Sequence, residues 1–173
     1  MIRLVPVGEI EDHVLSGLRE ALAEVFVEGA ELGNSMPLPP SAYNPKRGQH
    51  QASEFLYALA RLPRQGERLL GVADVDIYSP GLDFVFGLAA PGIQTAVISL
   101  TRLRPEYHGQ PPDKNLLLER AVREAVHEIG HLLTLGHCPD PGCVMAFSNS
   151  LEDTDRKGRA FCPRCQEKKA GRG

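Results

Sequence analysis

The chain has 173 residues, of which 42% are hydrophobic and 24% charged, and its formal net charge is -3. These values are typical of one globular domain with a real core, and they give no reason to expect general binding to nucleic acid or to an anionic membrane. No apolar run approaches the roughly 20 residues needed to span a bilayer, and the first eight residues are too short and interrupted for a signal peptide. We therefore expect a cytoplasmic monomer with no membrane partner.

The first 112 residues alternate between strand and helix patterns. Strands are predicted at residues 2–7, 69–78, 84–89 and 95–100, and helices at residues 10–27 and 49–62. Prolines divide residues 29–47 into a strand and an irregular connection. The short gap before the strand at 95–100 favours antiparallel pairing, because a parallel crossover needs a dozen or more residues. The alternation predicts an α/β sheet with one antiparallel strand.

A long helix follows, and it carries the clearest chemical pattern. Asp113 is a candidate N-cap, and apolar residues at helical spacing continue from it into His127-Glu128-x-x-His131. Histidines four residues apart share one helix face and can bind one ion, while Glu128 can hold water or a substrate carbonyl and move protons. His137 offers a third nitrogen, and zinc with three protein ligands keeps the open position of a catalytic site. The alternative is a buried helix with three incidental histidines.

Residues 138–173 contain all four cysteines and few long apolar runs. We expect irregular backbone there, with one short helix near residue 151 and a frayed basic tail at residues 166–173. The cysteines form two pairs with 18 residues between them, Cys138 with Cys143 and Cys162 with Cys165. This spacing favours a structural zinc ion on four thiolates, which would hold together a region too poor in apolar surface to fold alone. Two disulfides and a redox-active C-x-x-C are the alternatives.

Cys138 directly follows His137, so neighbouring residues would bind two different ions. The sequence thus predicts two zinc ions per chain, one catalytic and one structural. Ordering of the four-cysteine site would fix the chain just beyond the third histidine. We expect that loss of the structural zinc also weakens the catalytic site.

The pattern His127-Glu128-x-x-His131-x5-His137, taken with Met145 and the four cysteines, resembles the archaemetzincins of the metzincin clan of zinc metallopeptidases. The resemblance implies a metzincin-like α/β fold, with a twisted mixed sheet, one antiparallel edge strand, packed helices and an active-site helix. It implies one catalytic domain over residues 1–173, in which an α/β part at 1–137 ends in the zinc-binding motif and a zinc-stapled part occupies 138–173.

The same resemblance assigns roles to individual residues. It implies that His127, His131 and His137 hold a catalytic zinc ion, and that Glu128 is the general base acting on a zinc-bound water. It also implies that Met145 forms the Met-turn beneath the histidines. An edge strand at residues 84–89 would pair with an extended peptide or protein substrate, so that main-chain hydrogen bonds give affinity.

One position departs from the metzincin pattern. A glycine is expected three residues after the second histidine, and this chain has Thr134. The glycine allows a left-handed turn that costs a β-branched residue roughly 1–2 kcal/mol. We expect Gly136 to take over the turn two residues later.

Two other functions fit parts of the sequence. The first is a catalytically weak, zinc-containing peptide-binding protein, because ligands and a base do not guarantee turnover. The second is a zinc-knuckle module that binds nucleic acid, suggested by basic residues near the C-terminus. Interspersed acidic residues and the lack of interleaved aromatics favour a solvated face instead. The basic residues concerned are Arg156, Lys157, Arg159, Arg164, Lys168 and Lys169.

Overall fold

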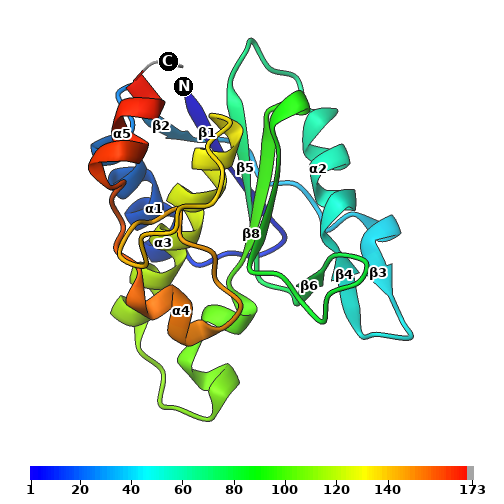
Figure 1. Ribbon diagram of the computed structural model, residues 1–173. Coiled ribbons are helices and arrows are strands. Elements are labelled where there is room, and N and C mark those ends of the chain that lie inside the picture. The colour runs from blue at the N-terminus through cyan, green and yellow to red at the C-terminus, as the bar shows by residue number, and fades with distance from the viewer. Residues whose placement is uncertain (171–173) are drawn as a thin grey trace.

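A mixed β-sheet organises the chain in the computed structural model, which describes residues 1–170 (Figure 1). Its strands are β1 (Ile2–Val7), β2 (Ala30–Leu32), β5 (Arg68–Ala73), β7 (Gly87–Ala90) and β8 (Thr95–Ser99). They lie in the order β2-β1-β5-β8-β7, with parallel pairing from β2 to β8 and antiparallel pairing between β8 and β7. The predicted α/β fold with one antiparallel edge strand is confirmed.

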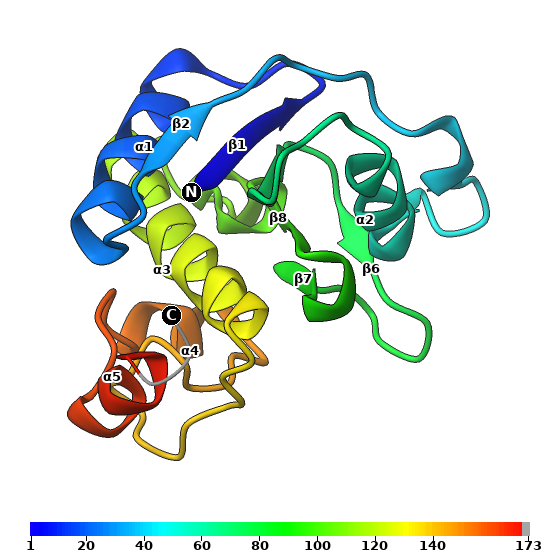
Figure 2. The same cartoon turned by 90° about the horizontal axis from the view of Figure 1, so that it is seen from above.

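Helices cover both faces of this sheet. Helices α1 (Asp12–Val25) and α3 (Lys114–Leu132) lie on one face and α2 (Ala52–Ala60) lies on the other (Figures 1 and 2). Along β1, Leu4 packs with the α1 and α3 side and the next residue, Val5, packs with the α2 side. Strands buried on both faces have nearly continuous hydrophobic sequences, which is why the central strands could be read from the sequence.

A second, small sheet changes two predicted boundaries. It consists of β3 (Tyr43–Asn44), β4 (Gln49–Gln51) and β6 (Ile77–Tyr78). The predicted strand at 69–78 is therefore two strands, and the predicted helix at 49–62 begins three residues later than expected. The cause is the side chain of Asp76, which accepts hydrogen bonds from Arg102 Nε at 2.7 Å and from Gln49 Nε2 at 3.0 Å. These bonds draw the chain out of the large sheet after β5.

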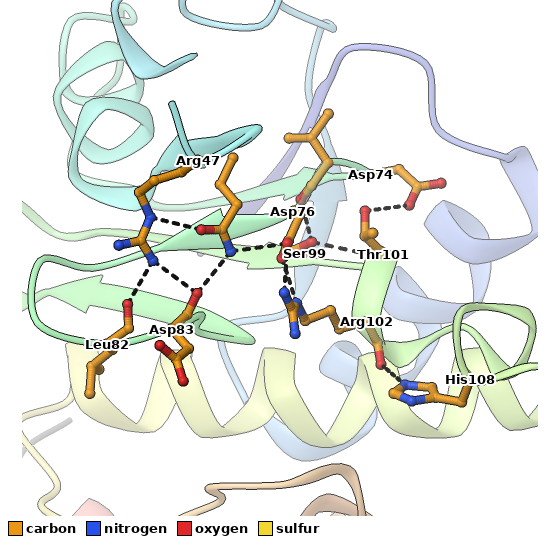
Figure 3. Close-up of polar contacts among 11 residues, drawn as sticks. Arg47, Asp74, Asp76, Leu82, Asp83, Ser99, Thr101, Arg102 and His108 are labelled. Atoms are coloured by element: carbon orange, nitrogen blue, oxygen red, sulfur yellow. Dashed lines mark hydrogen bonds and ion pairs between the residues drawn. The ribbon is translucent and has the colours of Figure 1, made fainter. Parts of the chain in front are cut away.

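The segment before β7 is also not a strand, although residues 84–89 were predicted as one. Figure 3 shows Arg47 donating from its guanidinium to the carbonyl oxygens of Leu82 at 2.8 Å and Asp83 at 3.0 Å. The guanidinium of Arg102 lies over the ring of Phe84, 4.2 Å from its centroid. These contacts keep residues 82–85 out of the pairing with β8. The Phe86 carbonyl accepts a hydrogen bond from the Ser99 amide of β8 at 2.9 Å, and β7 itself begins at Gly87.

The helix that carries the histidine motif begins as predicted, because the Asp113 side chain accepts a hydrogen bond from the Leu116 amide at 2.9 Å. The predicted helix near residue 151 is α4 (Leu151–Arg156). The predicted frayed tail is wrong for residues 166–170, which belong to α5 (Pro163–Ala170), while 171–173 lie outside the described residues. Lys169 stabilises α5, since its ammonium donates to the carbonyl of Val25 at 3.0 Å.

The C-terminal segment with α4 and α5 lies beside α3, on the side away from α2 (Figures 1 and 2). It therefore approaches the histidine motif from the side opposite to β7. Within residues 1–170, none of the helices combines the length and apolarity that crossing a membrane requires.

Candidate metal centres

Three histidine rings meet at the C-terminal end of α3. The Nε2 atoms of His127 and His131 are 3.0 Å apart, as expected for residues one helical turn apart. The ring of His137 lies 5.0 Å from that of His131 and 5.4 Å from that of His127, measured between centroids. One nitrogen from each ring lies within 4.8 Å of the other two. The fold thus brings together the three histidines that the motif pointed to.

Backbone carbonyls orient two of these rings. Nδ1 of His127 lies 2.8 Å from the carbonyl oxygen of Val144, and Nδ1 of His131 lies 2.8 Å from that of Leu135. A carbonyl only accepts, so each Nδ1 carries the proton, and the neutral rings turn their Nε2 lone pairs toward each other. This arrangement is repulsive unless a cation lies between the nitrogens. Tetrahedral zinc would set them about 3.3–3.4 Å apart, close to what is observed.

The electrostatics of the site favour neutral imidazole, which is the form that binds metal. Burial, and after it the charge of Lys157, lowers the pKa of His127 to about 2. Burial likewise lowers the pKa values of His131 and His137. The three rings are therefore available as neutral nitrogen ligands, and their chemistry fits zinc.

Glu128 lies beside the histidines, and its side chain is pressed against β7. It is 5% exposed. A Cβ atom added to Gly87 would lie only 2.7 Å from Oε1 of Glu128, so the absence of a side chain at Gly87 makes room for the carboxylate. Burial and the neighbouring Glu124 raise the pKa of Glu128 well above its usual value, while Lys157 opposes this. A basic carboxylate next to a metal site is suited to accept a proton.

A cleft of about 550 Å³ opens over these groups. One wall is β7 together with residues 82–86, which Arg47 and Arg102 hold in place. The other consists of α3, residues 134–137 and residues 147–149. Since β7 ends the sheet, its outer backbone edge is available to an extended chain lying in the cleft.

The turn after α3 contains Thr134 in the conformation that the glycine of the motif would take. Thr134 has a φ of 60°, whereas Gly136 is not among the residues with positive φ. The Leu135 amide donates to the Gly130 carbonyl at 3.0 Å and the Thr134 amide to that of His131 at 2.8 Å, which is the Schellman pattern. The prediction that Gly136 takes over the turn is therefore wrong. These hydrogen bonds, with the burial of Leu135, hold the threonine in a left-handed conformation.

Replacement of Thr134 by glycine should raise the free energy of unfolding by about 1 kcal/mol, because it relieves the strain of a β-branched residue at positive φ. Zinc affinity at the histidines should be unchanged or higher. Denaturant unfolding of the metal-loaded protein measures the first effect. Gly136→Ala is the matched control and should cost nothing, since an added Cβ there meets no atom within 4 Å. A loss of stability in Thr134→Gly would contradict the strain argument.

The four cysteines form a second cluster, next to the first. All four Sγ atoms lie within 4.8 Å of one another, and the Sγ atoms of Cys138 and Cys162 are 3.7 Å apart. Four thiolates around zinc would lie about 3.8 Å apart, whereas a disulfide requires about 2.05 Å. The thiols are free, so neither disulfide of the alternative interpretation is present in the structure.

The ionisation of these thiols also suits a cation. Burial opposes the thiolate of Cys138, but hydrogen bonds from the Asp140 backbone and from Arg164 outweigh it and lower its pKa to about 7. Burial, followed by the neighbouring thiols, raises the pKa of Cys165 to about 12, and burial also raises that of Cys143. Four thiolates cannot coexist at this spacing without a positive ion, so the donor set fits zinc.

Short segments connect the two clusters. Cys143 is followed by Val144, whose carbonyl orients His127, and then by Met145. The amide of Cys138 donates to the Met145 carbonyl at 2.8 Å. The Met145 side chain is fully buried against Gly130, and a Cβ atom at Gly130 would collide with its sulfur. The cysteine cluster thus fixes the chain that supports the histidines.

The sequence pattern predicts a solvated face for Lys157, and this prediction is wrong. Lys157 is 1% exposed and lines the cleft together with Glu124. Glu124 precedes Glu128 by one helical turn, and this spacing was the available signal that it would share the same face. No local pattern indicates that Lys157 pairs with Glu124, because the two residues are far apart in the sequence.

An open cleft with three histidine nitrogens that could hold a metal ion and a buried glutamate is the arrangement expected of a zinc metallopeptidase, and comparison with known proteins shows that the chain is of this class. The sequence profile of peptidase family M54 matches residues 42–170. The chain is 45% identical over 183 aligned positions to the archaemetzincin of Pyrococcus furiosus, and the alignment covers 100% of this chain and 95% of that protein.

Solved structures are similar throughout their length. A zinc-dependent peptidase from Methanocorpusculum labreanum matches with a TM-score of 0.90 at 30% identity, covering 98% of this chain and 100% of that one. An archaemetzincin from Methanopyrus kandleri matches with a TM-score of 0.88 at 37% identity, covering 99% of this chain and 94% of that one. The chain belongs to peptidase family M54, and the resemblance to the archaemetzincins is confirmed.

Proposed function

We propose that this metallopeptidase hydrolyses peptide bonds with a zinc ion on His127, His131 and His137 and with Glu128 as the general base. A second zinc ion, on Cys138, Cys143, Cys162 and Cys165, would have a structural role. The observation that carries the proposal is the convergence of the three histidine nitrogens and the Glu128 carboxylate in one cleft beside the free edge of β7.

Zinc bound at the histidines would polarise the scissile carbonyl and lower the pKa of water toward about 7. The outer edge of β7 would hydrogen-bond to the substrate backbone and align its scissile bond with the histidines. Glu128, directed into the cleft by Gly87, would accept the proton of the attacking water and pass it to the leaving amine.

We also propose that residues 1–173 act as one catalytic domain, with residues 138–173 bracing the motif. The monomeric state, the cytoplasmic location and the lack of nucleic-acid and membrane partners stay predictions from the sequence.

Zinc content and peptide cleavage test the proposal together. Protein purified without added metal or chelator should contain about two zinc ions per chain. It should also cleave members of a fluorogenic peptide library. A chelator should stop the cleavage and added zinc should restore it. His131→Ala is the control, and it should lose one zinc ion and all cleavage. Bound peptide without cleavage, at full zinc content, would instead favour the peptide-binding alternative.

A further inference from the structure

Lys157 is a buried cation that the proposed mechanism does not use. It follows α4 and is 1% exposed, although it lines the cleft. Its Nζ lies 3.0 Å from Oε1 of Glu124, but it makes no hydrogen bond within residues 1–170. A lysine buried in this way loses the hydration of its charge, so its partner must compensate for much of that cost.

Its partner is one of two buried carboxylates on the same face of α3. Glu124 is 3% exposed and Glu128 is 5% exposed, and they are one helical turn apart. Like charges at this spacing repel, and burial strengthens the repulsion. Within the described residues, the side chain of Glu124 accepts one hydrogen bond, from the hydroxyl of Thr154 at 3.0 Å from Oε1. This bond supplies no charge, so Lys157 is the cation that faces both carboxylates.

We propose that Lys157 is a positioning residue for peptide hydrolysis, because its ammonium neutralises Glu124 and so keeps Glu128 between Gly87 and the histidines. The inference rests on the proposed function and deepens it. Without the cation, the uncompensated charge of Glu124 would push the Glu128 carboxylate from its place. The Glu128 carboxylate already fills the space that the missing side chain of Gly87 leaves, where an added Cβ would be 2.7 Å from Oε1, so the backbone of β7 blocks movement to that side. Displacement would therefore carry Glu128 along the cleft, away from the reacting atoms.

A purely structural role for Lys157 makes a different prediction. α4 is also fastened to α3 by Arg120, whose guanidinium donates twice to Asp155 at 2.8 Å. Neither Arg120 nor Asp155 lines the cleft. Asp155→Asn is therefore a matched control, because it weakens the same contact between helices at a distance from Glu128.

The test is a double-mutant cycle of Lys157→Met, Glu124→Gln and the double variant, with Asp155→Asn beside it. The first readout is kcat and KM on a fluorogenic peptide. The second is calorimetric affinity for a peptide hydroxamate, measured on protein of verified zinc content. A hydroxamic acid gives up its proton when it binds zinc, and a well-placed carboxylate accepts it, so its affinity reports on Glu128 without turnover.

Each single variant should lower kcat and hydroxamate affinity by about tenfold or more with little change in KM. Glu124→Gln is affected because the unpaired ammonium would then draw Glu128 toward itself. The double variant, which leaves neither charge, should recover to within about threefold of the original chain. Asp155→Asn should lose stability and keep kcat and hydroxamate affinity. If Lys157→Met does not fold, the comparison of Glu124→Gln with the double variant still tests whether Lys157 acts through Glu124.

Two results would overturn the proposal. The first is single variants that lose stability but keep kcat and hydroxamate affinity, as Asp155→Asn does. The second is a double variant that remains as impaired as the single ones, which would mean that Lys157 does not act through Glu124. If the original chain cleaves no peptide, the proposed function fails, and the hydroxamate affinities still decide the role of Lys157.

Discussion

The Glu128→Gln variant should retain its zinc and lose peptide hydrolysis by roughly 100- to 10,000-fold, the usual contribution of a general base. Glutamine has the shape of glutamate, so it fits the same space against Gly87, but it cannot accept the proton of the attacking water. The three histidines are the expected ligands, so metal binding should be unaffected. Turnover of a fluorogenic peptide and elemental analysis of the same preparation measure the two effects.

Glu119→Gln is the matched control for this experiment. Glu119 lies on the same helix, α3, but its side chain is 49% exposed and contacts Arg123. Its replacement should change turnover by no more than about twofold, because isolated surface ion pairs contribute little. Full activity in Glu128→Gln would remove Glu128 from the mechanism, whereas loss of zinc would make it a ligand.

The Cys162→Ala variant should lose the structural zinc and weaken the catalytic site as well. Thiolate–zinc bonds supply folding free energy, so we expect the free energy of unfolding to fall by several kcal/mol. The affinity of the histidines for zinc should fall by about tenfold or more, as it does when groups that orient metal ligands are lost. The reason is the short connection from Cys143 through Val144, whose carbonyl accepts from His127 at 2.8 Å. Competition with a fluorescent chelator measures the affinity.

Cys162→His separates loss of metal from loss of the side chain. Zinc accepts three cysteines and one histidine in a tetrahedral site, so this variant should keep both metals and near-normal affinity at the catalytic histidines. Circular dichroism should first establish that both variants are folded at the temperature used. Normal catalytic zinc affinity in a folded Cys162→Ala protein would show that the two sites are independent.

The structure also bears on the nucleic-acid alternative. Of the basic residues that suggested it, Lys157 is buried and Lys169 is engaged with the carbonyl of Val25. Arg164 donates to the Sγ atom of Cys138 at 3.3 Å. These three therefore have contacts within the protein, which weakens the support that they gave to this alternative.

The sequence by itself determined the parts of this protein that depend on local spacing. The Asp113 cap and the apolar periodicity located α3, and the histidine and cysteine intervals located two candidate metal sites on it and after it. The central strands could be predicted because burial on both faces leaves a continuous hydrophobic run. The length of the connection before β8 was enough to predict antiparallel pairing at the sheet edge.

Only the tertiary structure decided what depends on contacts between distant segments. The pairing of Lys157 with Glu124, the close approach of Gly87 to Glu128, and the break after β5 caused by Asp76 each join residues far apart in the chain. The conformation of Thr134 was also decided there, because hydrogen bonds and the burial of Leu135 outweigh a local preference of about 1 kcal/mol. Periodicity and spacing report which face of an element is buried, but they do not report which partner meets it.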